Sequence, residues 1–135
     1  MDKLIIYFGL SAVLIAGSLA SANTLSCRFQ YDNGFATVTI TAATPLLAWQ
    51  EPYFGHMTVD IEGLELKPTF PVNLHPGDAS SRFEIKNGEL KLAKVMFNQG
   101  HQQVSIYPYA DGTRIYMASP YGLFGSEPIS QPCLK

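Results

Sequence analysis

The segment LSCRFQYDNGFATVTIT, residues 25–41, alternates apolar and polar side chains on both sides of a turn. In the first run Leu25, Cys27 and Phe29 occupy alternate positions, and in the second run apolar residues alternate with threonines. Successive side chains of a β-strand point to opposite faces, so each run presents one apolar and one polar face. The sequence DNG between them, residues 32–34, suits a tight turn because Asn-Gly tolerates positive φ angles. The segment therefore predicts a β-hairpin.

The rest of the chain after residue 22 repeats this pattern of short alternating runs separated by turn residues. We expect about eight strands and no helix there, with the strands near residues 25–31, 35–41, 56–63, 64–70, 81–85, 89–97, 101–109 and 113–118. Within 89–97 the alternation changes phase, which predicts a β-bulge near Ala93 or Lys94. Because nearly all the connections are short, strands that follow one another in sequence should pair side by side and antiparallel.

An open sheet of about eight strands would expose two edges, and closing it into a barrel removes both. We therefore predict an all-β fold, a small up-and-down antiparallel barrel, with a two-sheet β-sandwich as the alternative. A barrel of this size has an interior filled by side chains, or space for one small ligand.

The chain has two cysteines, Cys27 near its start and Cys133 near its end. In an exported protein such a pair predicts a disulfide, here closing a loop of about 100 residues worth up to ~4–5 kcal/mol. There is no Cys-x-x-Cys motif, so a redox-catalytic role is not favoured. The disulfide would bring the first strand and the C-terminal tail together.

The first 22 residues have the layout of a cleaved signal peptide. Lys3 precedes an apolar stretch, residues 4–17, and small residues (ASA) follow at 20–22. We expect cleavage after Ala22 and a single mature β domain, residues 23–135, in the periplasm or outside the cell. The apolar stretch is shorter than a typical spanning helix of about 20 residues, so no stable membrane anchor is expected after cleavage. A lipoprotein, suggested by the nearness of Cys27, lacks the usual residues before that cysteine.

The composition is that of a packed protein, with 47% hydrophobic and 15% charged residues. The net charge is −2, and the lysines and arginines are scattered singly. No basic stripe is available to neutralise phosphates, so the sequence excludes a typical nucleic-acid-binding protein.

No catalytic, metal-binding or cofactor-binding motif is recognisable, so no cofactor or metal is expected. His56, Asp60 and Glu62 share one parity along a strand, which favours a solvated polar strip over a metal site. Glu51 and Glu127 are acids in aromatic surroundings, and they would serve in a small hydrolase or lyase only if brought together with His56.

The long segment TPLLAWQEPYFGH, residues 44–56, and the C-terminal tail carry aromatic residues outside the regular pattern. One hypothesis is a contact surface, since Trp and Tyr dominate many recognition sites. Its candidate binding residues are Trp49, Gln50, Glu51, Tyr53, Phe54, His56, Tyr121 and Phe124. The alternative is that these segments fold over the ends of the barrel as lids, with Leu46 and Leu47 turned inward.

The function that the sequence favours is an exported, non-enzymatic binding protein that engages another protein through its aromatic loops, for example as an inhibitor. The first alternative is a carrier of a small apolar ligand inside the barrel. The second is a small hydrolase or lyase that uses Glu51, His56 or Glu127. The identity of a partner does not follow from the sequence.

Overall fold

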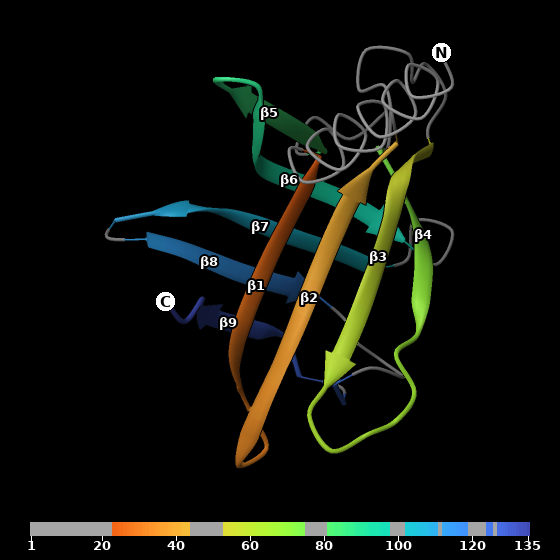
Figure 1. The fold of residues 1–135 in the computed structure, drawn as a ribbon, viewed down its shortest axis with the longest axis vertical. Coiled ribbons are helices and arrows are strands. Elements are labelled where there is room, and N and C mark those ends of the chain that lie inside the picture. The colour runs from red at the N-terminus through yellow and green to blue at the C-terminus, as the bar shows by residue number, and fades with distance from the viewer. Residues whose placement is uncertain are drawn as a thin grey trace, which may run out of the picture.

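The computed structural model describes residues 23–43, 53–74, 81–97, 102–110, 112–118, 124–125 and 127–135, with only the backbone of Tyr53. These residues form a nine-stranded antiparallel sheet (Figure 1), with strands β1 (Thr24–Tyr31), β2 (Gly34–Ala42), β3 (Tyr53–Ile61), β4 (Thr69–Asn73), β5 (Arg82–Lys86), β6 (Glu89–Phe97), β7 (Gln102–Tyr109), β8 (Gly112–Ala118) and β9 (Ile129–Pro132). Within that part of the chain, no helix has the length and apolarity needed to cross a membrane.

The sheet curls into a nearly closed eight-stranded antiparallel barrel, which confirms the predicted fold class. Its strand order is β1-β2-β3-β4-β6-β7-β8-β9, so nearly all sequence neighbours pair. The additional strand β5 pairs with the first part of β6, outside this path. Figure 1 shows β1 to β3 crossing in front of β6 to β9, as two sides of one curved wall.

The hairpin predicted at residues 25–41 is present, with Tyr31 paired to Gly34 at its turn. The two turn residues, Asp32 and Asn33, both have positive φ, at 49° and 65°. Two consecutive positive φ angles fit the right-handed twist of the flanking strands. Gly34 itself already belongs to β2, so the turn lies one residue earlier than the Asn-Gly pair suggested.

The inner face of the barrel is filled by alternate residues of the strands. The largest side chains that are almost completely buried are Phe29, Phe54, Phe97, Ile40, Met57, Ile106, Ile115, Met117, Val38, Val59, Val72 and Val95. Each such side chain contributes roughly 1.5–3 kcal/mol by leaving water, so this packing is the main source of stability.

The prediction of a strand at residues 64–70 is wrong for most of that range, because β4 begins only at Thr69. Leu64 is 58% exposed and Leu66 is 82% exposed, although both alternate with charged residues. The chain turns at Gly63, where φ is +96°, and runs as a connection until β4 begins at Thr69. Because β4 lies antiparallel to β3, the segment between them must reverse direction, and this constraint overrides the local alternation.

The bulge expected near Ala93 or Lys94 lies earlier in β6. Ile85 pairs with Leu90 and Glu84 pairs with Leu92, so Lys91 has no direct partner on β5. After this insertion β6 continues into regular pairing with β7. The bulge therefore lies within the pairing of β5 with β6, shortly before Ala93 and Lys94, which pair with both β5 and β7.

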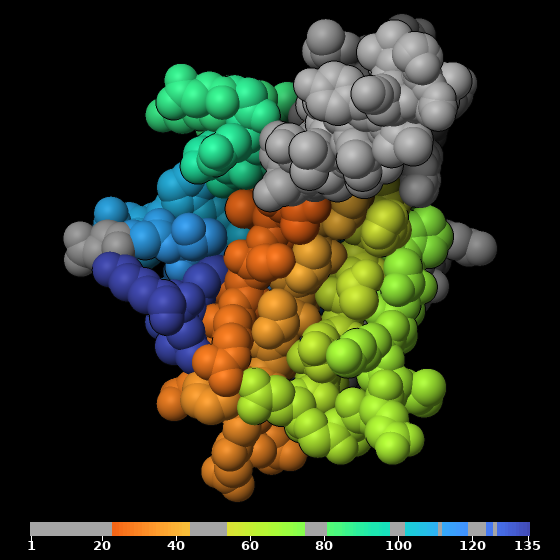
Figure 2. All heavy atoms as spheres, viewed as in Figure 1, coloured from red at the N-terminus to blue at the C-terminus, as the bar shows by residue number. Residues whose placement is uncertain are grey.

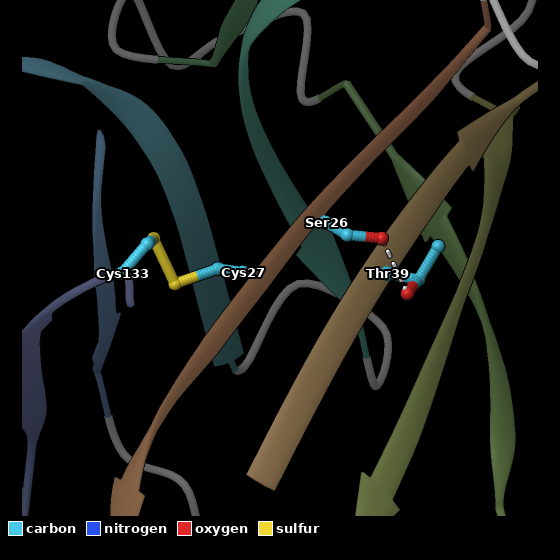
Figure 3. The surroundings of a disulfide bond; sticks show 4 residues. All are labelled: Ser26, Cys27, Thr39 and Cys133. Atoms are coloured by element: carbon cyan, nitrogen blue, oxygen red, sulfur yellow. Dashed lines mark hydrogen bonds between the residues drawn. A yellow bond between two sulfur atoms is a disulfide. The ribbon is translucent and has the colours of Figure 1, made fainter. Parts of the chain in front are cut away.

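The barrel closes where β1 meets the C-terminal segment. Cys27 in β1 and Cys133 just after β9 form a disulfide with their Cα atoms 5.1 Å apart, as Figure 3 shows, and this pairing was predicted. The amide of Leu134 also donates a hydrogen bond to the carbonyl of Arg28, at 2.7 Å. In the space-filling view the C-terminal residues (dark blue) lie against β1 (orange), so the wall is filled at this seam (Figure 2).

Removing the disulfide should destabilise the protein without changing its fold. We expect the double variant Cys27→Ser/Cys133→Ser to lose about 2–5 kcal/mol of unfolding free energy, because the unfolded chain regains the freedom of the closed loop. Urea unfolding followed by circular dichroism measures this. Reduced wild-type protein should show the same loss, and a loss below about 1 kcal/mol would contradict the role assigned to the seam.

Gly55 in β3 lies opposite Ala42 of β2, where β3 also shifts its register against β4. A Cβ at this position would overlap the backbone carbonyl of Thr41 and come within 2.8 Å of the Cα of Ala42. We expect Gly55→Ala to cost about 3 kcal/mol, since backbone atoms of β2 must move to relieve the overlap.

The matched control is Gly34→Ala, because an added Cβ there meets nothing closer than 3.8 Å. Equal losses of unfolding free energy in the two variants, measured by urea unfolding, would argue against the close approach of β2 and β3.

Candidate functional site

A row of outward-facing side chains crosses the C-terminal half of the sheet. Directly paired residues on five successive strands make up this cross-strand row: Arg82, Lys94, Ser105, Tyr116 and Ser130. The residues next to them in β6, β7 and β8 point into the core, so the row itself lies on the outside of the barrel.

The outer surface of the barrel is hollowed at Ser105, whose side chain is smaller than those around it. Although it is on the outer face, it is only 1% exposed. Larger side chains surround it, with Lys94 and Tyr116 on the neighbouring strands and Gln103 and Tyr107 along β7. The resulting depression has a volume of about 290 Å³ and is called the outer groove here; its lining consists of Arg82, Leu92, Lys94, Gln103, Ser105, Tyr107, Pro108 and Tyr116.

The outer groove is positively charged. Arg82 and Lys94 are directly opposite each other on β5 and β6, an arrangement that is unfavourable for like charges. Among the described residues, neither has a carboxylate within ion-pair distance, whereas three other cations do. Those pairs are Arg28 with Glu62 at 2.7 Å, Lys67 with Asp60 at 3.7 Å, and Lys91 with Glu89 at 2.8 Å.

The pair formed by Lys91 and Glu89 shows how such a cation is normally balanced on this surface. The Lys91 ammonium donates a hydrogen bond to Glu89 Oε1, and it holds the pKa of that carboxyl below its ordinary value. Nothing equivalent is found for Lys94 in the described chain, so its charge is available to a ligand in the outer groove.

Polar and aromatic groups complete the outer groove. Gln103 Nε2 lies 3.5 Å from Ser105 Oγ, with the amide as donor, so the serine hydroxyl can still donate its own proton. Tyr107 contacts Tyr109 edge to face, with ring centroids 6.3 Å apart, and Tyr116 is partly exposed on the next strand. None of the described lining residues is a His, Cys, Asp or Glu, so the described part of the groove holds no Ser-His-Asp arrangement.

A second depression, of about 350 Å³, lies beside the turn between β7 and β8 and the C-terminus. Arg114 lies over the ring of Tyr109, with its guanidinium carbon 5.4 Å from the ring centroid, and it also contacts the hydroxyl of Ser130 at 3.3 Å. Because Arg114 is paired with Tyr107, this depression adjoins the outer groove across two strands. The two depressions together place cations such as Lys94 and Arg114 beside Tyr107 and Tyr109.

Two of the aromatic residues expected at a contact surface are buried instead. Phe54 is completely buried and packs against Phe83 with centroids 5.3 Å apart. Phe124 is 5% exposed and packs edge to face on Phe29 and Tyr31. These two rings therefore act as core or lid residues, as the alternative interpretation held. The register shift between residues 53 and 55 explains why the alternation in β3 did not reveal this for Phe54.

The other candidate residues divide into one that is described and several that are not. His56 is exposed on the outer face of β3, opposite Thr41 and Pro71. The remaining candidates lie outside the described residues or lack a described side chain: Trp49, Gln50, Glu51, Tyr53 and Tyr121, together with Leu46 and Leu47. The hypothesis of a binding loop at these positions stays a prediction.

The described residues provide no assembled catalytic or metal centre. No group of three or more His, Cys, Asp or Glu side chains among them is placed to hold a metal ion. Asp60 and Glu62, the neighbours of His56 in the predicted polar strip, are instead paired with Lys67 and Arg28. Glu127 precedes β9, which β1 and β2 separate from His56 on β3. Glu51 is not among the described residues.

Sequence reasoning missed the outer groove as a site. Its signal was present in QQVSIYPY, residues 102–109, where a small Ser105 lies between larger Gln103 and Tyr107 on the outward parity. The contributions of Arg82 and Lys94 require the pairing register of β5, β6 and β7, which alternation alone does not supply.

Comparisons with protein-family models, with curated proteins and with solved structures gave no match.

The two faces of β7 should respond differently to truncation. Ile106→Ala should lower the unfolding free energy by about 2–5 kcal/mol, because the side chain is fully buried in the core. The neighbouring change Tyr107→Ala should cost about 1 kcal/mol or less, since that ring lies on the outer groove. Urea unfolding followed by circular dichroism compares them. If both losses were the same, Tyr107 would belong to the core rather than to a surface site.

Proposed function

We propose that this protein is an exported, non-enzymatic binding protein that engages another protein through the outer groove. The observation that carries the proposal is the construction of the groove, with tyrosines and unpaired cations around a buried serine. Tyr and Arg are enriched among residues that dominate binding energy. The strands that hold them are fixed by the core beneath, so little ordering is required on binding.

Export is supported by the signal-like sequence of residues 1–22 and by the disulfide between Cys27 and Cys133. Disulfides are rare in compartments that keep thiols reduced. The proposed place of action is the periplasm or the exterior, and inhibition of the partner is one result that such binding would have.

Binding on the outside is favoured over carriage of a small apolar ligand. A carrier needs space inside the barrel, but the inner positions hold large side chains such as Phe29, Phe97 and Met57, all fully buried. The outer groove opens on the outer face of β6, β7 and β8, and the second depression opens beside the C-terminus. The aromatic segment at residues 44–56 adds a second surface to be tested.

The test is quantitative capture of partners by the mature protein from an extract of its own compartment, followed by affinity measurement. The double variant Tyr107→Ala/Tyr116→Ala should weaken binding of the specific partner at least about tenfold, because two aromatic contacts are lost. Leu66→Ala is the matched control, since it truncates a side chain that is 82% exposed and not part of the groove.

A second double variant, Trp49→Ala/Tyr53→Ala, tests the aromatic loop separately. If it alone abolishes capture, the binding surface is the loop and not the outer groove. If neither double variant changes the affinity of any specific partner, both proposed surfaces are refuted.

A further inference from the structure

The pairing of Arg82 with Lys94 is locally unfavourable in the free protein. Side chains directly opposite on antiparallel strands have Cβ atoms about 4.5–5.5 Å apart, and like charges at that spacing repel. On the same face of β5, Glu84 is opposite Leu92 and makes no ion pair with either cation. Departures from good local pairing are expected mainly at functional sites. The surface at this point is therefore suited to receive a negative charge.

The described lining of the outer groove also offers many hydrogen-bond donors and no carboxylate. Arg82 has five N–H donors in a fixed fork, Lys94 has three, and the Ser105 hydroxyl has one available proton beside its contact with Gln103. An ionised carboxylate is an acceptor only and takes hydrogen bonds from both guanidinium and ammonium groups. Donor number and charge thus match the same kind of ligand group.

We propose that the occupant of the outer groove is an acidic side chain of the partner protein, held between Arg82 and Lys94. The proposal rests on the proposed function and specifies its chemistry. A volume of about 290 Å³ accommodates the side chain of one acidic residue with its neighbours. Apolar or aromatic residues beside the acid pack on Tyr107 and Tyr116, which flank Ser105.

The extent of the surface favours a polypeptide over a single sugar acid. The second depression adjoins the outer groove through the pair Tyr107 and Arg114, and it carries further cations at Arg114 and Lys135. An extended acidic segment crossing the strands reaches both depressions, because neighbouring strands are only about 4.8 Å apart. A single uronic acid would occupy one depression only.

The experiment uses the oxidised mature protein, labelled with ¹⁵N, and two defined probes. The acidic probe is the peptide acetyl-Tyr-Glu-Tyr-amide, and the matched neutral probe is acetyl-Tyr-Gln-Tyr-amide. We expect the acidic peptide to shift the amide signals of Lys94, Ser105, Tyr107 and Tyr116, and to bind at least about tenfold more tightly than the neutral one. Raising the salt concentration should weaken the acidic peptide alone.

Charge variants locate the contact. Arg82→Gln and Lys94→Gln should each weaken the acidic peptide about tenfold. Lys86→Gln is the matched control for Arg82→Gln, because it removes one positive charge from the same strand, β5, outside the groove lining and should leave binding unchanged.

The same two variants provide a second readout. Because each removes one of two opposed like charges, Lys94→Gln and Arg82→Gln should raise the melting temperature of the free protein by about 1–4 °C while weakening the peptide. A lower melting temperature for both would identify these cations as structural and overturn the proposal.

Three other results would also overturn it: equal affinity for the two peptides, equal effects of Lys86→Gln and Arg82→Gln, or binding of galacturonic acid without binding of the acidic peptide. Failure of this proposal is distinguishable from failure of the proposed function. If the Tyr107→Ala/Tyr116→Ala variant loses its partner while Arg82→Gln and Lys94→Gln retain it, the protein binds through the groove but not through a carboxylate.

Discussion

The seam between β1 and the C-terminal segment is the constraint on which the rest of the structure depends. It consists of the disulfide between Cys27 and Cys133 and the hydrogen bond from Leu134 to Arg28. Without this seam the wall would be an open sheet with free edges on β1 and β9. With it, each strand of the barrel wall has an inner and an outer face, and alternate side chains point to the core and to the surface. The outer groove lies on the face of β6, β7 and β8 that is opposite the core.

Local patterns predicted most of the fold because most of its contacts are between sequence neighbours. The hairpin at residues 25–41, the strand at 89–97 and the disulfide all followed from alternation, turn residues and cysteine position. The structure of residues 64–70 did not follow from its sequence pattern. Leucines alternate with charged residues there, but residues 64–68 are not part of a strand of the described sheet. The structure of this segment is determined by the turn at Gly63 and by the reversal of direction that the antiparallel pairing of β3 with β4 requires. Both depend on the path of the chain in three dimensions and not on local alternation.

The candidate site was predicted less well than the fold because it depends on register. A tyrosine on the outward parity of β7 can be identified from alternation, but its neighbours on β6 and β8 cannot. The placement of Arg82 opposite Lys94 follows only after the bulge at Lys91 has set the pairing of β5. Phe54 was assigned to an irregular segment, but it lies in β3 beside a register shift and its ring is buried in the core. Bulges and register shifts therefore obscured the residues of the candidate site more than they obscured the strand order.

The outer groove is formed by differences in side-chain size on one face of a wall whose other face is packed independently. Ser105 makes the hollow only because its four neighbours are larger, and none of those neighbours supports the core beneath. Mutations at these positions can therefore remodel the shape and charge of the surface at little cost in folding energy. One stable scaffold can therefore present differently shaped and charged outer surfaces after the exchange of a few outward side chains on β5 to β8.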